Sequence, residues 1–495
     1  NSGTLTASNL ETISGVTIFT NNQDTLSLPS LTAITNTGFA NSADKTINFS
    51  SASPITISTS VANRHFTNSG TMNFSSSETT FSKTATMTVT NSGTITFPAD
   101  STLALSPTTF TNNAGANFQL PATSLISNIT TITNAGTMAA ASDANVTIST
   151  VTNFTNSGTI DGVANLTVIG AGTFNQTGVI GDSGLNLTIG DGATFSYNKN
   201  TNWSFANLTI DSGGTLTHAA NSTTALGKQY AIDFTLSGNL TVNGTINVDG
   251  KGYALQQGPG AGINLDARGS GAGYGGNGGN SQTGAQGGST YGSPTEPADL
   301  GSGGGNTQGG VGGGAIKISA SGTTAINGAI SANGTSGTSS DGGGSGGSVW
   351  INTNILSGSA SVTANGDGYT GWSGGGGGGR IAITYNDASG ATLTKQAYGG
   401  STGYRKGGAG TIYTRDMDDP ANINGALLVD NGTVDGANTT QYNVSETYDS
   451  VTVQNYGKYV IPAEYTLTTP SLTGNSTATL TNNGTFNHTG ATISN

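Results

Sequence analysis

A short phrase of alternating apolar and polar residues, repeated at nearly constant spacing, constrains the fold of this chain more than any other feature. The phrase starts with Asn, continues with an apolar residue and Thr, and ends on Ile or Val. It returns every 20 or 21 residues, and a fifth copy follows after a longer gap: residues 145–148, 165–168, 186–189, 207–210 and 239–242. Internal periods of this length indicate stacked structural repeats.

The two-residue alternation predicts β-strands, because each phrase is too short for a helix and is rich in β-branched residues. A unit of about 21 residues cannot bury its own apolar face, but copies stacked at about 4.8 Å bury it between them. The sequence therefore predicts an all-β chain that forms a single elongated, right-handed parallel β-helix (a β-solenoid) with Gly-rich loop insertions. The right-handed sense follows the general preference of parallel crossover connections.

A second phrase, apolar-Thr-Asn-Ser/Ala-Gly-Thr-apolar, recurs through the first 180 residues. Its glycines lie 20 to 23 residues apart and are Gly70, Gly93, Gly115, Gly136, Gly158 and Gly178. Because glycine adopts positive φ at little steric cost, we expect each to form a left-handed corner between two strands. The Asn of the phrase returns once per turn. It is expected either to form a ladder of amide hydrogen bonds along the stack or to be a solvated corner residue.

Turn length divides the chain into three regions. Residues 1–250 are predicted to form a β-solenoid with turns of about 21 residues, and residues 415–495 to continue it. Residues 251–414 are predicted to form a Gly-rich β-solenoid with turns of about 32 residues and long loops. This estimate uses strand markers spaced 31 to 33 residues apart, which are Ile316, Val349, Ile381 and Ile412. The extra Gly and Ser residues are either protruding loops or Gly-rich strands packed at close range. The longest insert, residues 250–314, is either a floppy loop or an ordered flap.

Composition excludes several functional classes. Of the 495 residues, 79 are Gly, none is Cys and only 8% are charged. The net charge is −12 with 14 basic residues, so the basic stripe of a nucleic-acid-binding protein is missing. No apolar run reaches the ~18 residues of a membrane span. Without Cys there are no disulfides or thiolate metal sites, which fits an exported, cell-surface protein of bacteria. Disorder is the alternative for so much Gly, Ser and Thr, but the regular apolar positions oppose it.

Residues suited to catalysis are few and scattered. Asp416 and Asp418 are expected to share a strand face, but Pro420 follows at once and marks an exposed junction. The three histidines, His65, His218 and His488, show no common spacing. The run 374–379 lacks the Lys-Ser/Thr and the helix of a phosphate-binding loop. We therefore predict no catalytic, cofactor-binding or metal-binding residues and no enzymatic activity.

Two further groups of residues leave alternatives open. Asp341, Asp367 and Asp387 lie in Gly-rich stretches where oxygen ligands for Ca²⁺ are conceivable, although the nine-residue repeat of calcium β-rolls is missing. Ten aromatic residues cluster in the middle of the chain: Tyr253, Tyr274, Tyr291, Trp350, Tyr369, Trp372, Tyr385, Tyr398, Tyr404 and Tyr413. These rings either form a platform for sugars or cover the Gly-rich backbone.

The chain resembles the right-handed β-helix surface proteins of bacteria, which include adhesin-like passengers, filamentous-haemagglutinin-type exoproteins and giant Gly-rich repeat proteins. The resemblance lies in the Thr-Asn-Ser-Gly-Thr phrases, the Asn-Leu-Thr strands, and the segments Gly-Gly-Ser-Val-Trp-Ile and Gly-Gly-Arg-Ile-Ala-Ile. It covers nearly the whole chain and bears on fold more than on function. It implies an extracellular or cell-surface location and transfers no catalytic residue.

These observations predict a non-enzymatic structural or adhesive protein, with surface polysaccharide as a candidate partner. A β-helix lyase or hydrolase acting on polysaccharides is the alternative, and ice binding by Thr arrays is a third hypothesis. Residue 1 is Asn rather than Met, so the chain is expected to be processed or part of a longer one. Residues 492–495 followed by residues 1–4 nearly rebuild the corner phrase. We therefore expect either a head-to-tail fibre with a repeat of about 90 Å or flanking repeats in a longer chain.

Overall fold

The computed structural model describes residues 3–181, 183–221, 227–338, 340–441 and 444–494. These residues form short β-strands and no helix, and the strands stack mainly in parallel, which confirms the all-β parallel β-solenoid. The chain comprises two compact units. Unit 1 contains Asn1–Ser196 and Phe205–Thr215, and unit 2 contains Tyr197–Ser204 and Leu216–Asn495. The predicted head-to-tail contact involves Asn1, Ser2 and Asn495, which lie outside the described residues, and it stays a prediction.

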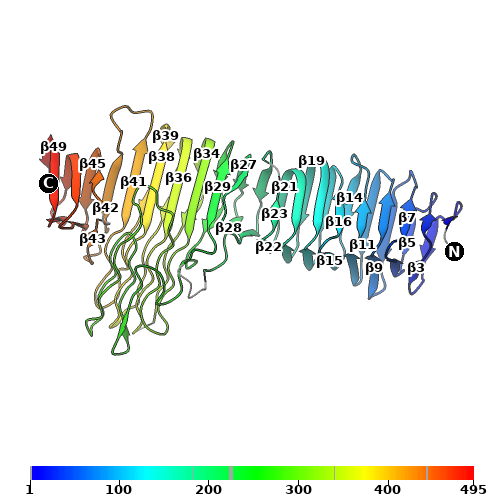
Figure 1. Ribbon diagram of the computed structural model, residues 1–495, viewed down its shortest axis with the longest axis horizontal. Coiled ribbons are helices and arrows are strands. Elements are labelled where there is room, and N and C mark those ends of the chain that lie inside the picture. The colour runs from blue at the N-terminus through cyan, green and yellow to red at the C-terminus, as the bar shows by residue number, and fades with distance from the viewer. Residues whose placement is uncertain (1–2, 182, 222–226, 339, 442–443, 495) are drawn as a thin grey trace. The chain divides into compact units, whose positions relative to one another are not determined.

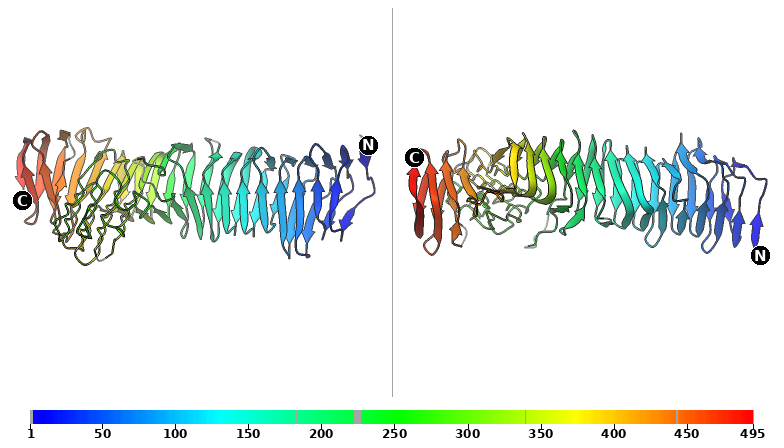
Figure 2. Two further views of the ribbon diagram at one scale, coloured as in Figure 1. Left: turned by 60° about the horizontal axis from the view of Figure 1, so that its bottom comes forward. Right: turned by 90° about the horizontal axis from the view of Figure 1, so that it is seen from above.

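Each turn of unit 1 contributes its strands to three parallel stacks (Figures 1 and 2). The first stack contains β3 (Phe19–Asn21), β6 (Phe39–Asn41), β9 (Arg64–Asn68), β12 (Met87–Asn91), β15 (Thr109–Asn112), β18 (Thr131–Asn134), β20 (Asn153–Asn156) and β22 (Gly172–Gln176). The second contains β1 (Thr4–Thr6), β4 (Thr25–Ser27), β7 (Thr46–Phe49), β10 (Thr71–Phe74), β13 (Thr94–Thr96), β16 (Asn117–Leu120), β19 (Thr137–Ser149), β21 (Thr159–Ile169) and β23 (Val179–Ile180). The third contains β2 (Thr12–Ser14), β5 (Ala33–Thr35), β8 (Ile55–Thr59), β11 (Glu78–Lys83), β14 (Thr102–Leu105), β17 (Thr123–Ser127), the second halves of β19 and β21, β24 (Asn186–Ile189) and β27 (Asn207–Ile210).

The Asn-Leu-Thr phrases pair as their spacing predicts. Val146 pairs with Leu166, Leu166 with Leu187, and Leu187 with Leu208, always in parallel and in register. None of these four side chains is more than 3% exposed. The two-residue period therefore places one apolar side chain of each turn directly above its copy, and the core is the resulting column.

The corner glycines serve a purpose other than the one predicted. Gly93, Gly136 and Gly158 do not have the left-handed φ that we expected, so that prediction was wrong. A Cβ on any of the three would instead overlap a carbonyl oxygen of the preceding turn. The backbone at these corners lies too close to the preceding turn to leave room for a side chain, so glycine is required for space. Gly115, in the variant phrase with one inserted residue, does adopt φ 78° in open surroundings.

The asparagines of the same phrase form the predicted ladder and are not solvated. From Asn21 to Asn156, each side-chain amide donates to the side-chain oxygen one turn further along, and the series ends on Gln176. Every rung is at most 2% exposed. A burial of this kind is tolerated because the amides satisfy one another and nearby backbone carbonyls.

Unit 2 continues the pattern with longer turns. The marker residues Ile316, Val349, Ile381 and Ile412 pair in parallel, as predicted. The principal stack contains β29 (Ile232–Leu236), β34 (Ala315–Ile326), β36 (Ser348–Gly358), β38 (Arg380–Tyr385) and β41 (Thr411–Asp416), with β30 (Leu240–Val242) on β34 and β39 (Asp387–Ala391) on β36. A second contains β31 (Thr245–Asn247), β35 (Ala329–Ser331), β37 (Ser361–Thr363) and β40 (Thr394–Gln396).

Strand direction reverses at the acidic junction that follows β41. β41 pairs antiparallel with β42 (Ala426–Asp430), and the strands after β42 are again parallel to one another. Those strands are β45 (Ser450–Gln454), β47 (Thr466–Gly474) and β49 (Thr485–Ser494), with β43 (Thr439–Thr440), β44 (Glu446–Thr447), β46 (Lys458–Ile461) and β48 (Thr479–Asn482) in the neighbouring stacks. The connection 417–425 is too short for a parallel crossover of a dozen or more residues, so the chain turns back as a hairpin.

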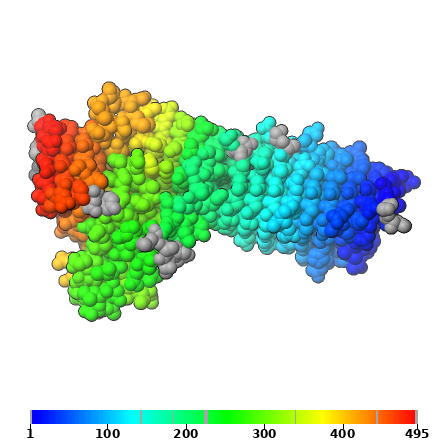
Figure 3. Space-filling model, viewed as in Figure 1, coloured from blue at the N-terminus to red at the C-terminus, as the bar shows by residue number. Residues whose placement is uncertain are grey.

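The Gly-rich segments of unit 2 form a hydrogen-bonded bundle beside the strands (Figures 1 and 3). Within residues 374–379, the N–H groups of 374 and 377 donate to segment 269–272, those of 375 and 378 to segment 405–408, and those of 376 and 379 to segment 364–367. Partners that repeat every third residue are typical of the threefold polyproline II helix, and glycine permits its close packing. The insert 250–314 belongs to this bundle, so it is an ordered flap.

Candidate functional site

The acidic residues at the junction lie at the end of β41 and in the turn that follows it. Asp416 ends β41, and its Oδ1 accepts the backbone N–H groups of Asp418 at 3.1 Å and Asp419 at 3.3 Å. The carboxylates of Asp418 and Asp419 are exposed in the turn that follows. Asp416 therefore caps a turn. Asp418 lies beyond the end of β41, so the expectation that it shares a strand face with Asp416 was wrong.

His218 is the one histidine that is fully buried. Its Nδ1 lies 2.8 Å from the carbonyl oxygen of Ala219, and its Nε2 accepts the N–H of Ala315 at 3.4 Å. Nδ1 therefore bears the proton of the neutral ring. Burial lowers the pKa of His218 to about 4. His65 on β9 is exposed, and His488 lies on β49.

The aspartates considered for Ca²⁺ each have partners of their own. Asp341 accepts the N–H of Gln308 and the hydroxyl of Thr338. Asp367 and Asp387 each accept a neighbouring backbone N–H. Burial raises the pKa of Asp367. Among the described residues, no three His, Cys, Asp or Glu side chains are grouped closely enough to hold a metal ion.

Of the ten aromatic residues of the middle region, four are buried, three are exposed, and Trp350, Tyr385 and Tyr398 are half-buried. Tyr274 and Tyr291 are buried with ring centroids 4.7 Å apart, and Tyr253 and Tyr413 are buried as well. Desolvation raises the pKa of Tyr274 and of Tyr291. These four rings cover the Gly-rich backbone and the strands, which is one of the two alternatives that the sequence left open.

The exposed group lies at the ends of the Gly-rich segments. Tyr369, Trp372 and Tyr404 are 46%, 52% and 47% exposed. The guanidinium of Arg268 lies 4.2 Å from the centroid of the Trp372 ring, and that of Arg405 lies 5.5 Å from the Tyr404 ring. We call these five residues the aromatic apex. The aromatic residues were visible in the sequence, but the two arginines were missed. Nothing local connects Arg268 with Trp372, whereas Arg405 directly follows Tyr404 and could have been noticed.

Backbone hydrogen bonds hold the apex in place. The N–H of Tyr404 donates to the carbonyl of Ser373 at 2.7 Å, and that of Gln282 donates to the carbonyl of Trp372 at 2.9 Å. The N–H of Gly374 donates to Gly269, the residue after Arg268. The segments that bear Trp372 and Tyr404 are thus hydrogen-bonded to each other immediately beside those two rings. The apex is a preorganised surface, which lowers the entropic cost of binding.

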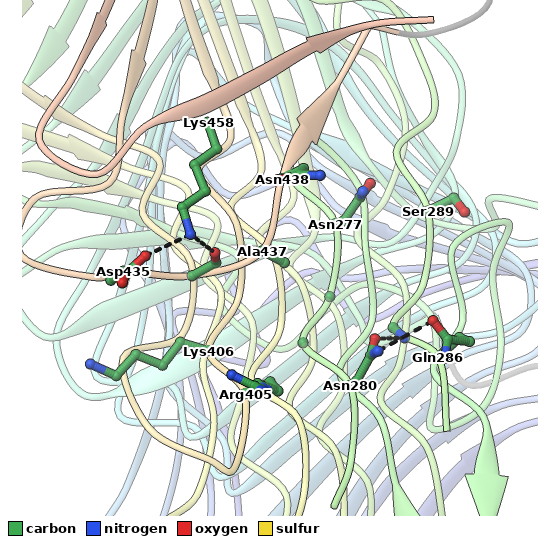
Figure 4. Close-up of a pocket in the computed structure, with 14 residues that line it drawn as sticks. Asn277, Asn280, Gln286, Ser289, Arg405, Lys406, Asp435, Ala437, Asn438 and Lys458 are labelled. Atoms are coloured by element: carbon green, nitrogen blue, oxygen red, sulfur yellow. Dashed lines mark hydrogen bonds and ion pairs between the residues drawn. The ribbon is translucent and has the colours of Figure 1, made fainter. Parts of the chain in front are cut away.

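A polar cleft of about 560 Å³ begins beside the apex, and Figure 4 shows its side chains. Arg405, Lys406 and Lys458 line it together with Asp435. Lys458 Nζ lies 2.6 Å from Asp435 Oδ1 and donates to the carbonyl of Gly436 at 2.9 Å. The hydrogen bond and the charge of Lys458 lower the pKa of Asp435. We call this feature the basic cleft, and Arg405 belongs both to it and to the apex.

The chain matches no protein-family model, no curated protein and no solved structure. None of the described residues belongs to a helix long and apolar enough to cross a membrane.

Proposed function

We propose that the protein is a non-enzymatic, extracellular adhesive protein of the cell surface, in which the aromatic apex binds polysaccharide. The β-solenoid is the scaffold, and the Gly-rich bundle presents the binding surface. The observation on which this proposal depends is the exposure of Tyr369, Trp372 and Tyr404 on hydrogen-bonded segments. The resemblance to bacterial β-helix surface proteins is part of the same proposal.

The three exposed rings, with two arginines beside them, form a surface whose chemistry suits a sugar. Tyr and Trp offer a flat apolar face and a polar edge, and both are enriched at binding surfaces. Sugar rings present C–H groups on one face and hydroxyls at the rim, so they match an aromatic face bordered by arginine donors. Arg268 and Arg405 provide such donors beside Trp372 and Tyr404.

The test is binding of the purified chain to a panel of immobilised polysaccharides. Trp372→Ala and Tyr404→Ala are each expected to weaken binding about tenfold, the effect of losing a well-placed aromatic contact. Tyr456→Asn is the matched control, because Tyr456 is also exposed, lies outside the apex and has a positive φ that Asn tolerates. A chain that binds no polysaccharide, or apex variants that bind as well as the control, would contradict the proposal.

The same incubations distinguish adhesion from the enzymatic alternative. We expect no release of reducing sugars from any polysaccharide. Sugar release that disappears in Asp416→Asn or Asp418→Asn would identify the junction as an active site. The function would then be that of a polysaccharide hydrolase or lyase instead of adhesion.

A further inference from the structure

We propose that the basic cleft binds the anionic groups of the polysaccharide, so that the preferred partner is an acidic polysaccharide with carboxylate or sulfate groups. This inference rests on the proposed adhesive function and specifies its ligand. Three of the 14 basic residues of the chain line this one cleft, although the net charge of the chain is −12. Positive charge is therefore concentrated where the aromatic apex ends.

The charges of the cleft are only partly balanced. Asp435 neutralises Lys458 through their ion pair at 2.6 Å. Neither Arg405 nor Lys406 forms an ion pair with any carboxylate of the described residues, whose ion pairs are Lys45–Asp24 and Lys458–Asp435. Arg405 is exposed and Lys406 is half-buried. Lys406 also interacts electrostatically with Asp435, so this one carboxylate is set against three cationic groups of the cleft. The cleft thus keeps an excess of positive charge, which an anionic ligand would offset.

The neutral lining of the cleft suits a sugar. Asn280 and Gln286 present amides that hydrogen-bond one another at 3.2 Å and have further donors and acceptors for hydroxyl groups. The volume of about 560 Å³ lies within the usual range of small-ligand sites, about 300–1,000 Å³.

Arg405 connects the two surfaces. Its guanidinium lies over Tyr404 in the apex, and the same residue lines the cleft. A polysaccharide that stacks on the apex would therefore extend its next residues over the cleft. Stacking would contribute affinity for any sugar polymer, and the cleft would select those that bear negative charge.

The experiment uses two pairs of probes that differ only in charge. One pair is polygalacturonate and its carboxyl-reduced, neutral form, and the other is dextran sulfate and dextran. At low salt, we expect the full chain to bind at least one charged probe about tenfold more tightly than its neutral counterpart. Salt should reduce the difference, because exposed charges are screened. The pair that shows the larger difference identifies carboxylate or sulfate as the group bound.

The variant Lys406→Gln removes one unpaired charge and keeps a polar side chain. We expect about three- to tenfold weaker binding to the charged probe and unchanged binding to the neutral one. Lys251→Gln is the matched control, since Lys251 is a half-buried lysine of the same unit that does not line the cleft. It should bind all probes like the unsubstituted chain.

The outcomes separate this inference from the proposed function. Equal binding of charged and neutral probes, or unchanged binding of the charged probe by Lys406→Gln, would overturn the acidic preference and leave adhesion through the apex standing. If Lys406→Gln weakened binding equally to the charged and the neutral member of a pair, the acidic preference would be overturned as well, because Lys406 would then act through the structure of the cleft. A DNA oligonucleotide bound as tightly as the charged probe would show mere polyanion attraction and contradict the inference. Failure to bind all four polysaccharides would overturn both proposals.

Discussion

The side-chain amide of Asn91 donates to Oδ1 of Asn112, one turn further along, at 2.9 Å, and neither residue is exposed to solvent. The second N–H of the Asn91 amide donates to the backbone carbonyl of Asn117 at 2.9 Å. Both donors are satisfied inside the core. Because each rung is at once donor and acceptor, the ladder specifies the register between successive turns.

Asn112→Ala should therefore destabilise unit 1 strongly. The substitution removes the acceptor of Asn91 and leaves the carboxamide oxygen of Asn134 and the carbonyl of Thr137 without their donor. Each unsatisfied buried group costs about 1–3 kcal/mol, so we expect a loss of at least about 2 kcal/mol in the free energy of unfolding. Denaturant unfolding followed by circular dichroism measures it.

Asn165→Ala is the control for the ladder. Asn165 donates to Asn145 at 2.7 Å in a second ladder, which is exposed to solvent. Water can replace that hydrogen bond, and the expected loss is below about 1 kcal/mol. Equal effects of the two substitutions would show that burial of the first ladder does not matter.

Gly158→Ala should destabilise the fold far more than a substitution at Gly115. A Cβ at position 158 would overlap the carbonyl oxygen of Gly136, whereas the surroundings of Gly115 are open. Overpacking of this kind costs about 1–3 kcal/mol. Gly115→Asn should cost less than about 1 kcal/mol, because Asn tolerates the φ of 78° at that position. Thermal or denaturant unfolding compares the stabilities of the two variants. The reverse order would show that close approach of the backbone is not what requires glycine at position 158.

Unit 2 should lose stability on acidification through His218. The folded pKa, about 4, lies below the ordinary value of 6.5, so the unfolded chain binds a proton that the folded chain excludes. The stabilisation is complete above pH 6.5 and is lost progressively as the pH falls to about 4. It amounts to about 3 kcal/mol for a shift of this size. In His218→Leu, the difference in unfolding free energy between pH 7 and pH 4 should shrink by about this amount, and an unchanged difference would argue against a buried neutral ring.

Arg380 should be essential for attaching the Gly-rich insert to the strands. It is 2% exposed, its Nε donates to the carbonyl of Tyr291 at 3.0 Å, and its guanidinium also donates to Thr411 Oγ1 at 2.9 Å. Arg380→Met should cost about 2–4 kcal/mol, because it leaves these acceptors unpaired in the interior. Arg380→Lys should recover little of this stability, since an ammonium group lacks the planar fork of a guanidinium.

Limited proteolysis of residues 250–314 and denaturant unfolding report this effect. Arg415→Met is the control, because Arg415 is half-buried and makes a long hydrogen bond of 3.4 Å to Asn422. The free energy of unfolding of Arg415→Met should remain within about 1 kcal/mol of that of the unsubstituted chain. A protected insert in Arg380→Met would show that glycine–glycine hydrogen bonds alone hold the bundle.

The amino-acid sequence by itself determines the strand stacks. Residues such as Leu166 and Leu187 alternate with polar neighbours and recur at a constant period, so pairing like with like is the register that buries all of them. The repeated position of the asparagines follows from the same period, but their burial does not. A repeated amide is compatible with solvent or with a ladder until the depth of its position is known.

Only the tertiary structure decides the rest. Glycine has no side chain, so the bundle segments show no apolar period, and their threefold hydrogen bonding depends on neighbours distant in sequence. The role of Gly158 depends in the same way on where the carbonyl of Gly136 lies. Arg268 meets Trp372 because Gly269 and Gly374 are hydrogen-bonded. Arg405 follows Tyr404 in the chain, and the cleft forms beside it where the N–H of Ala437 donates to the carbonyl of Lys406. Backbone contacts between distant segments thus bring the side chains of the proposed site together, and such contacts leave no pattern in the sequence.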